Sequence, residues 1–229
     1  MAKESAKIRR EAYVAPRAGV RTDTARKRNT EAGLTEAQRK ALGAQESRIR
    51  NFATERAVVV GEDGSVNPRG NPMIDSRGRE VTHGSSSRVR LEPGRIPENS
   101  VLTHNHPSDG IGLAGRVGSA FSGADIRTAA NRNLREIRAV TPNYTYSAKR
   151  PAGGWKFSGS AFNAEYERLY RKYIREYGQK TSDMLKRHGG ISRRDVDVYN
   201  NRLNVVVAHR VMKELSAKYG FSYTRRRSS

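Results

Sequence analysis

Short β-branched stretches alternate with helix-forming segments between residues 50 and 158, and this alternation predicts an α/β core. A capping box that begins at Thr35 predicts a helix up to about residue 50, and Ser122 is expected to begin a second helix that runs to about residue 135. Turn residues separate the segments that we expect to be strands. These segments are residues 55–60, a strand near Val66, short strands within 67–95, and residues 101–104, 137–146 and 154–157.

After residue 158 the apolar residues recur at helical spacing instead. One helical face carries Phe162, Tyr166, Leu169, Tyr170, Tyr173, Ile174 and Tyr177. This tyrosine stripe favours core packing over a platform that stacks nucleic-acid bases. His188-Gly189-Gly190 interrupts the pattern, and a further helix is predicted from about residue 194 to 219. We therefore expect a flexible basic arm at 1–34, an α/β domain at 35–158 and a helical C-terminal region at 159–229.

The charge balance points to polyanions as possible partners. The chain has 44 Lys and Arg residues against 23 Asp and Glu residues, a net charge of +21. Basic residues dominate the first 50 positions and recur at Arg225, Arg226 and Arg227. Such a chain is attracted to nucleic acid, although charge alone gives no specificity and also suits a solvated surface. The basic ends of the chain are therefore a candidate nucleic-acid contact.

Composition also excludes several classes of protein. There is no cysteine, which rules out disulfides and thiolate metal sites. No apolar stretch approaches the ~18 residues of a membrane-spanning helix, and the N-terminus lacks the apolar core of a secretory signal. We expect an intracellular protein, in the cytoplasm or, if the gene belongs to a phage, in the particle or the host cytoplasm.

Two segments carry the residues expected to do chemistry. The first is Thr103-His104-Asn105-His106-Pro107 at the end of a predicted strand, and the second is Ser122-Gly123-Ala124-Asp125 at the start of a predicted helix. Histidines two residues apart on a strand point to the same face, so both imidazoles can reach one ion. An aspartate in the next helix completes a three-ligand set that suits Zn²⁺ and leaves a position open for water. The sequence thus predicts a catalytic zinc site.

Hydrolysis at such a site needs two further groups. A carboxylate has to take the proton of the attacking water and return it to the leaving amine. A fixed hydroxyl or the metal has to stabilise the oxyanion. Ser122 lies one helical turn before Asp125 and is a candidate for the second role, although Ser-x-x-Asp is also an ordinary helix capping box.

These motifs resemble those of the JAMM (JAB1/MPN/Mov34, MPN+) zinc metalloproteases, and His-Asn-His-Pro-Ser is especially similar to their bacterial RadC-like branch. The resemblance covers roughly residues 50–158. It implies a JAB/MPN fold, a cytidine-deaminase-like mixed sheet flanked by helices, here with a helical C-terminal extension. It also implies hydrolysis of peptide or isopeptide bonds, often beside ubiquitin-like tails. By its motif His104, His106 and Asp125 hold the metal, Ser122 assists, and Glu55 is the catalytic glutamate.

The sequence departs from the family's motif at one point, and several other residues compete for the same roles. Residues 107–124 separate His106 from Asp125, longer than the family's usual spacing of ten, so the nearer Asp109 competes as a ligand. This Gly-rich insertion at 107–121 is expected to affect substrate access. The glutamates that compete with Glu55 are Glu62, Glu80, Glu92 and Glu98. His83, His188 and His209 are expected to be structural or solvent-facing, and Trp155 is expected to pack in the core or at its rim.

The sequence thus predicts a JAMM-type zinc metallopeptidase that acts on a protein or peptide, and the resemblance adds substrates with a ubiquitin-like tail. The alternative is a basic nucleic-acid-binding or phage or mobile-element structural protein that carries a vestigial JAB domain. Metal content and the salt dependence of DNA binding distinguish the two. Oligomeric state is not predicted.

Overall fold

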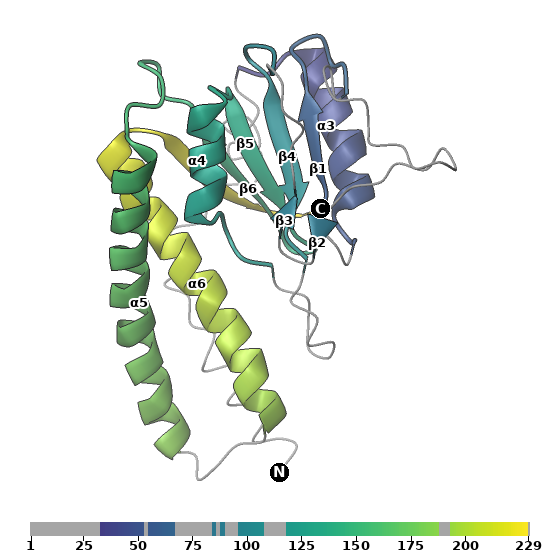
Figure 1. The fold of residues 1–229 in the computed structure, drawn as a ribbon. Helices are drawn as coiled ribbons and strands as arrows, with labels where there is room; N and C mark the ends of the chain where they lie inside the picture. Colours follow the sequence, from purple (N-terminus) through teal and green to yellow (C-terminus); the bar gives the residue numbers. More distant parts are fainter. Residues whose placement is uncertain are drawn as a thin grey trace.

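A five-stranded mixed sheet lies at the centre of the molecule (Figure 1). This is a computed structural model, and it describes residues 33–52, 55–66, 84–85, 88–89, 96–107, 118–187 and 193–228. The strands in spatial order are β1 (Ala57–Val60), β4 (Val101–Asn105), β5 (Glu136–Val140), β6 (Tyr144–Lys149) and β7 (Ser222–Arg227). The pair β4–β5 is parallel, and the other neighbouring pairs are antiparallel. A separate antiparallel pair joins β2 (Gly84–Ser85) to β3 (Arg88–Val89).

Helices cover both faces of the sheet (Figure 1). One face packs against α3 (Glu36–Ile49), which begins with the predicted capping box at Thr35. The opposite face packs against α4 (Gly123–Asn131), and α5 (Gly159–Arg187) and α6 (Arg193–Tyr219) form a long hairpin beside it. The predicted α/β class, a mixed sheet flanked by helices, is confirmed.

Alternation along β4 determines which side chains meet which helices. Val101 is buried with Leu42 of α3, whereas Leu102 is buried with Ile126 of α4 and Leu215 of α6. Each such fully buried aliphatic side chain contributes ~1.5–3 kcal/mol to folding. Since a shift of one residue would reverse both faces, these two apolar clusters fix the register of the strand that carries the histidines.

The predicted stripe on α5 is core packing, as expected. Phe162, Leu169 and Tyr173 are buried, and they share one apolar cluster with residues of the sheet and of α6. The predicted boundary at residue 158 therefore separates segments that pack into a common core. Among the described helices, none has the combination of length and apolarity that a bilayer-crossing segment needs.

One predicted strand was wrong, and a strand that was not predicted takes its place in the sheet. Residues 154–157 form no strand: Gly154 has φ +84°, and the Trp155 indole donates to the Leu134 carbonyl. The neighbour of β6 is β7 instead, so Arg225 and Arg226 belong to an edge strand and not to a tail. The C-terminal region is thus not purely helical. Trp155 packs against the core, as predicted.

Smaller differences concern element boundaries. The predicted strand at 137–146 is the hairpin β5–β6, which turns at residues 141–143. Helix α4 ends at Asn131, four residues early, and Asn133 follows with φ +48°. Near Val66 there is only a single bridge to Val60 among the described residues. The predicted arm at 1–34 lies outside the described residues except at its last two positions, and so does most of 107–121.

Candidate metal centre

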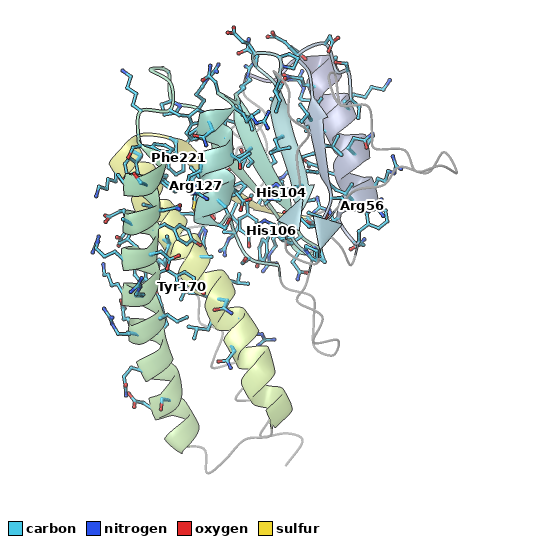
Figure 2. The ribbon with its side chains drawn as sticks, in the orientation of Figure 1. Arg56, His104, His106, Arg127, Tyr170 and Phe221 are labelled. Carbon is cyan, nitrogen blue, oxygen red and sulfur yellow. The ribbon has the colours of Figure 1, made fainter. Side chains whose placement is uncertain are left out.

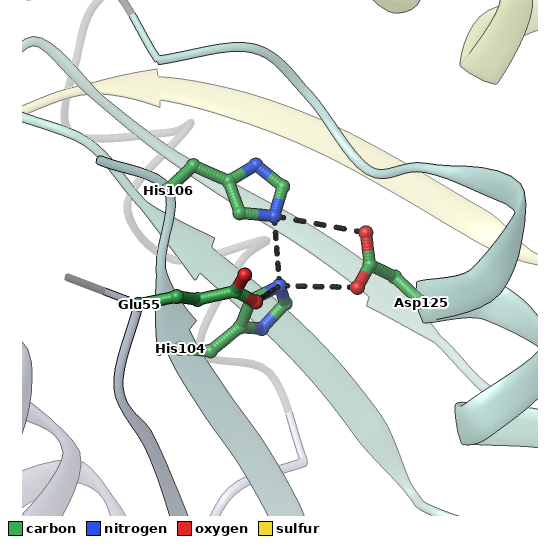
Figure 3. A group of neighbouring side chains, drawn as sticks. All are labelled: Glu55, His104, His106 and Asp125. Carbon is green, nitrogen blue, oxygen red and sulfur yellow. Dashed lines mark hydrogen bonds and ion pairs between the residues drawn. The ribbon is translucent and has the colours of Figure 1, made fainter. Parts of the chain in front are cut away.

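The pairing of β1 with β4 brings the predicted glutamate to the two histidines. Ala57 of β1 lies opposite His104 of β4. The backbone amide of Asn105 donates to the Arg56 carbonyl, so the pairing extends one residue beyond β1. The same register sets Glu55 opposite His106. Alternation turns Glu55 and His104 toward the face that α4 covers. Figure 2 shows His104 and His106 on the side of the sheet that faces α4. Asp125, in the first turn of α4, approaches from that side (Figure 3).

These four side chains converge on one point. Their ligand atoms all lie within 4.8 Å of one another. The Nε2 atoms of His104 and His106 are 2.9 Å apart. The two carboxylate oxygens of Asp125 lie 3.3 Å from His104 Nε2 and 3.6 Å from His106 Nε2, whereas Glu55 Oε1 is 4.0 Å from His104 Nε2. The residues predicted from sequence as ligands and base are therefore brought together (Figure 3).

The hydrogen bonds of His106 leave its Nε2 atom available to a cation. Nδ1 of His106 lies 2.9 Å from the Ser119 carbonyl, and because a carbonyl only accepts, Nδ1 carries the proton in the neutral ring. Nε2 then presents its lone pair to the Asp125 carboxylate, which is also an acceptor. A proton on His106 Nε2, a proton donated by His104 Nε2 at 2.9 Å, or a metal ion between them makes this approach favourable.

The donor set fits a metal ion. Ligands of a tetrahedral zinc at ~2.1 Å are about 3.4 Å apart, close to the three distances among His104, His106 and Asp125. Glu55 lies slightly farther out. Nε2 of His104 is the ligand atom directed at the cluster, whereas its Nδ1 is buried and has no hydrogen-bond partner among the described residues. These four buried or half-buried residues could therefore bind a metal ion.

Burial and charge shift the pKa values of the acidic groups in opposite directions. Burial raises the pKa of Glu55, and the facing imidazoles of His104 and His106 oppose this only in part. For Asp125, burial also favours the neutral form, but the two imidazoles outweigh it and hold its pKa well below the usual range. Asp125 is thus an anion suited to a cation, and Glu55 has the affinity for a proton that a general base needs.

The metal affinity is expected to depend on pH through His106. Burial disfavours the imidazolium, but the hydrogen bond and charge of Asp125 overcome it and raise the pKa of His106 to about 9. A metal ion has to displace this proton, so the apparent affinity should rise by about tenfold per pH unit between pH 7 and 9 and then level off. Competition with a chromophoric chelator measures it, and an affinity independent of pH would contradict the prediction.

The same shift has a consequence for stability without metal. Because the pKa of His106 is raised on folding, its contribution is fully present below pH 6.5 and is lost as the pH rises through about 9. The metal-free protein should therefore become less stable over the range in which metal binds more tightly.

Ser122 positions Asp125 through a reciprocal capping box. The Ser122 hydroxyl donates to Asp125 Oδ2 at 2.8 Å and accepts from the Asp125 amide, while the Ser122 amide donates to the same carboxylate oxygen at 2.7 Å. The predicted cap is thus present. In this arrangement the hydroxyl is engaged with a candidate ligand, and a direct catalytic part for Ser122 stays a prediction.

Removing this hydroxyl should weaken metal binding. Ser122→Ala is expected to raise the metal dissociation constant by about 10–100-fold, as loss of groups that orient ligands does, and to cost about 1 kcal/mol as a lost helix cap. The matched control is Ser158→Ala, whose hydroxyl accepts from the Ala161 amide at the start of α5. The control should lose similar stability and keep the metal affinity. Equal metal affinities in the two variants would contradict the positioning role.

Two residues that hold the ligands in place were not predicted from the sequence. A Cβ at Gly118 would lie 2.6 Å from the His106 carbonyl, so only glycine lets the chain return there and present the Ser119 carbonyl to His106. Tyr166 of α5 donates to the Phe121 carbonyl at 3.3 Å, just before α4 begins. The glycine was visible as a loop residue, but no local pattern reveals its neighbour across the fold.

The residues that compete for these roles lie away from the metal centre, where the structure describes them. Glu62 is half exposed and faces Asn99 and Arg135, and Glu98 is exposed. His209 lies 2.9 Å from the Tyr223 hydroxyl, in the structural role predicted for it. The rivals outside the described residues are Glu80, Glu92, Asp109, His83 and His188.

Comparison with known proteins adds no relative. No protein-family model matches the sequence. Neither the curated proteins nor the solved structures give a significant match. The resemblance to JAMM proteases therefore depends on the motifs alone, and the JAB/MPN fold stays a prediction.

Proposed function

We propose that this protein is a zinc-dependent metallopeptidase that hydrolyses a peptide or isopeptide bond. The observation that supports this most is the convergence of Glu55, His104, His106 and Asp125, whose ligand atoms lie within 4.8 Å of one another although they come from three separate stretches of sequence. The motif likeness to JAMM proteases supplies the reaction class, which geometry alone does not.

In this proposal His104, His106 and Asp125 hold the zinc. Two imidazoles and one carboxylate are a common ligand set for a catalytic zinc, which leaves a position for water or substrate. Zinc would lower the pKa of a bound water toward ~7 and polarise the scissile carbonyl. The charge of Asp125 and the bond from His106 to the Ser119 carbonyl both raise the basicity of the His106 imidazole.

Glu55 would move the proton. It stands farther from His104 Nε2 than Asp125 does, at 4.0 Å against 3.3 Å, which leaves it outside the closest ligand shell. Its raised pKa lets it take a proton from the attacking water and deliver it to the leaving amine. Ser122 would keep the Asp125 carboxylate directed at the metal.

The net charge of +21 supports a second candidate, a nucleic-acid-binding protein with a vestigial site. The two candidates differ in what metal removal does. In the first, it abolishes an activity, and in the second it leaves a strongly salt-dependent binding to DNA unchanged.

Metal removal therefore tests the proposal. Full-length protein should carry one zinc per chain, and chelation should abolish cleavage of a panel of fluorogenic peptide and ubiquitin-like isopeptide substrates. Adding zinc should restore the cleavage, because the ligands themselves remain in place. Absence of zinc from the purified protein, together with no uptake on adding it, would refute the proposal and favour the nucleic-acid-binding candidate.

A further inference from the structure

Asn105, which separates the two histidines, faces away from the metal centre. Alternation along β4 places His104 toward α4 and Asn105 toward α3. Asn105 is fully buried, in a place where an apolar side chain would satisfy a strand covered on both faces. A buried amide is costly unless its hydrogen bonds are made, so its contacts should show why it is there.

The contacts of Asn105 are with the segment that carries Glu55. Its Oδ1 accepts from the Arg56 amide at 2.6 Å, and its Nδ2 donates to the Phe52 carbonyl at 3.1 Å. Its own backbone amide donates to the Arg56 carbonyl at 3.0 Å. Asn105 thus binds the chain on both sides of Glu55, between the end of α3 and the start of β1.

We propose that Asn105 is a positioning residue that holds Glu55 over the histidine pair. This inference rests on the proposed function. Glu55 lies just before β1, where one backbone bond, from Asn105 to Arg56, extends the ladder beyond the strand. The two side-chain bonds of Asn105 reinforce the pairing at this end. The same β4 backbone then holds His104, His106 and, through Asn105, the base.

The chemistry of the side chain supports this assignment. The segment offers one amide N–H and one carbonyl, and an amide side chain supplies both an acceptor and a donor. Aspartate would accept from Arg56 but could not donate to the Phe52 carbonyl. Leucine would fill the space and leave both backbone groups unsatisfied, at a cost of about 1–3 kcal/mol each.

The test compares full-length Asn105→Ala with Thr103→Val. Thr103 is buried on the same face of β4 and donates to Glu46 of α3, so its loss removes a comparable bond without touching the Glu55 segment. Hydrogen exchange at the Arg56 amide should be about tenfold faster in Asn105→Ala, as loss of one buried hydrogen bond implies, and unchanged in Thr103→Val. An unchanged rate in Asn105→Ala would overturn the proposal.

A second measurement follows the effect to the metal centre. Cobalt substituted for zinc reports its surroundings in the visible spectrum. Asn105→Ala should bind cobalt and alter the spectrum as Glu55→Gln does, and the double variant should match Glu55→Gln alone, since both changes act through one carboxylate. A wild-type spectrum for Asn105→Ala, or additive changes in the double variant, would overturn it.

Two further outcomes, a variant that does not fold and a wild-type chain that takes up no cobalt, can be distinguished from these results. If Asn105→Ala does not fold, Asn105→Asp keeps the acceptor for Arg56 and lacks the donor for Phe52, and a wild-type cobalt spectrum in that variant would count against the role. If the wild-type chain takes up no cobalt, the proposed function fails. Two measurements without metal then decide whether Asn105 positions Glu55. The first is the hydrogen-exchange rate of the Arg56 amide. The second is the imidazole NMR signals of His104 and His106, which Asn105→Ala and Glu55→Gln should change alike.

Discussion

Glu55→Gln is expected to keep one metal ion per chain and to lower hydrolysis by about 10²–10⁴-fold, the range for loss of a general acid–base group. Glutamine has the size of glutamate but cannot take a proton. The metal should remain because the closest ligand atoms belong to His104, His106 and Asp125. Mass spectrometry measures the metal content per chain, and turnover of the same substrate panel measures the loss of hydrolysis.

The control for this change is Glu62→Gln, at a half-exposed glutamate that pairs with Arg135 away from the metal centre. It should leave both metal and turnover unchanged. If Glu55→Gln instead lost the metal, Glu55 would be a ligand and the proton would have to move through another group. Undiminished turnover in Glu55→Gln would remove its assigned role.

The His104→Ala/His106→Ala double variant is expected to bind no metal at this site and to have no detectable hydrolysis. Only the carboxylates of Glu55 and Asp125 would remain, and oxygen pairs of this kind hold zinc poorly compared with imidazoles. Losing both imidazoles also leaves Asp125 without the charges that stabilise its anion. Metal analysis after dialysis with zinc tests the prediction.

A histidine elsewhere provides the comparison. His209→Ala removes a half-buried imidazole that contacts Tyr223, so it should lower stability and retain one zinc per chain. Stoichiometric zinc in the double variant would show that the metal binds elsewhere, and the ligand assignment would then be abandoned.

The residues of the candidate site could be predicted because their signal is local. His104 and His106 are two apart on a strand, and Ser122 and Asp125 share one helical turn, so short-range geometry groups each pair. Glu55 followed from the motif resemblance, and the β1–β4 register places it opposite His106. The long spacing before Asp125 did not separate it from the histidines, because the chain returns at Gly118 and Ser119.

The features that the sequence did not predict depend on contacts between residues that are far apart in the chain. Arg225 and its neighbours have the composition of a solvated tail, and only pairing with β6 makes them a strand. Residues 154–157 have strand-like composition, but the bond from Trp155 to Leu134 turns that segment away from the sheet. Asn105 belongs to the recognised motif, yet its role depends on where Phe52 and Arg56 lie.

The position of β7 has a consequence for the order of folding. β6 and β7 are neighbours in the sheet, yet the whole α5–α6 hairpin separates them in the chain (Figure 1). Hairpin contacts are local and form early, whereas this pairing requires closure of a long loop, which costs chain entropy before any bond is made. We expect β7 to dock last during refolding and its amides to be the least protected of the five strands.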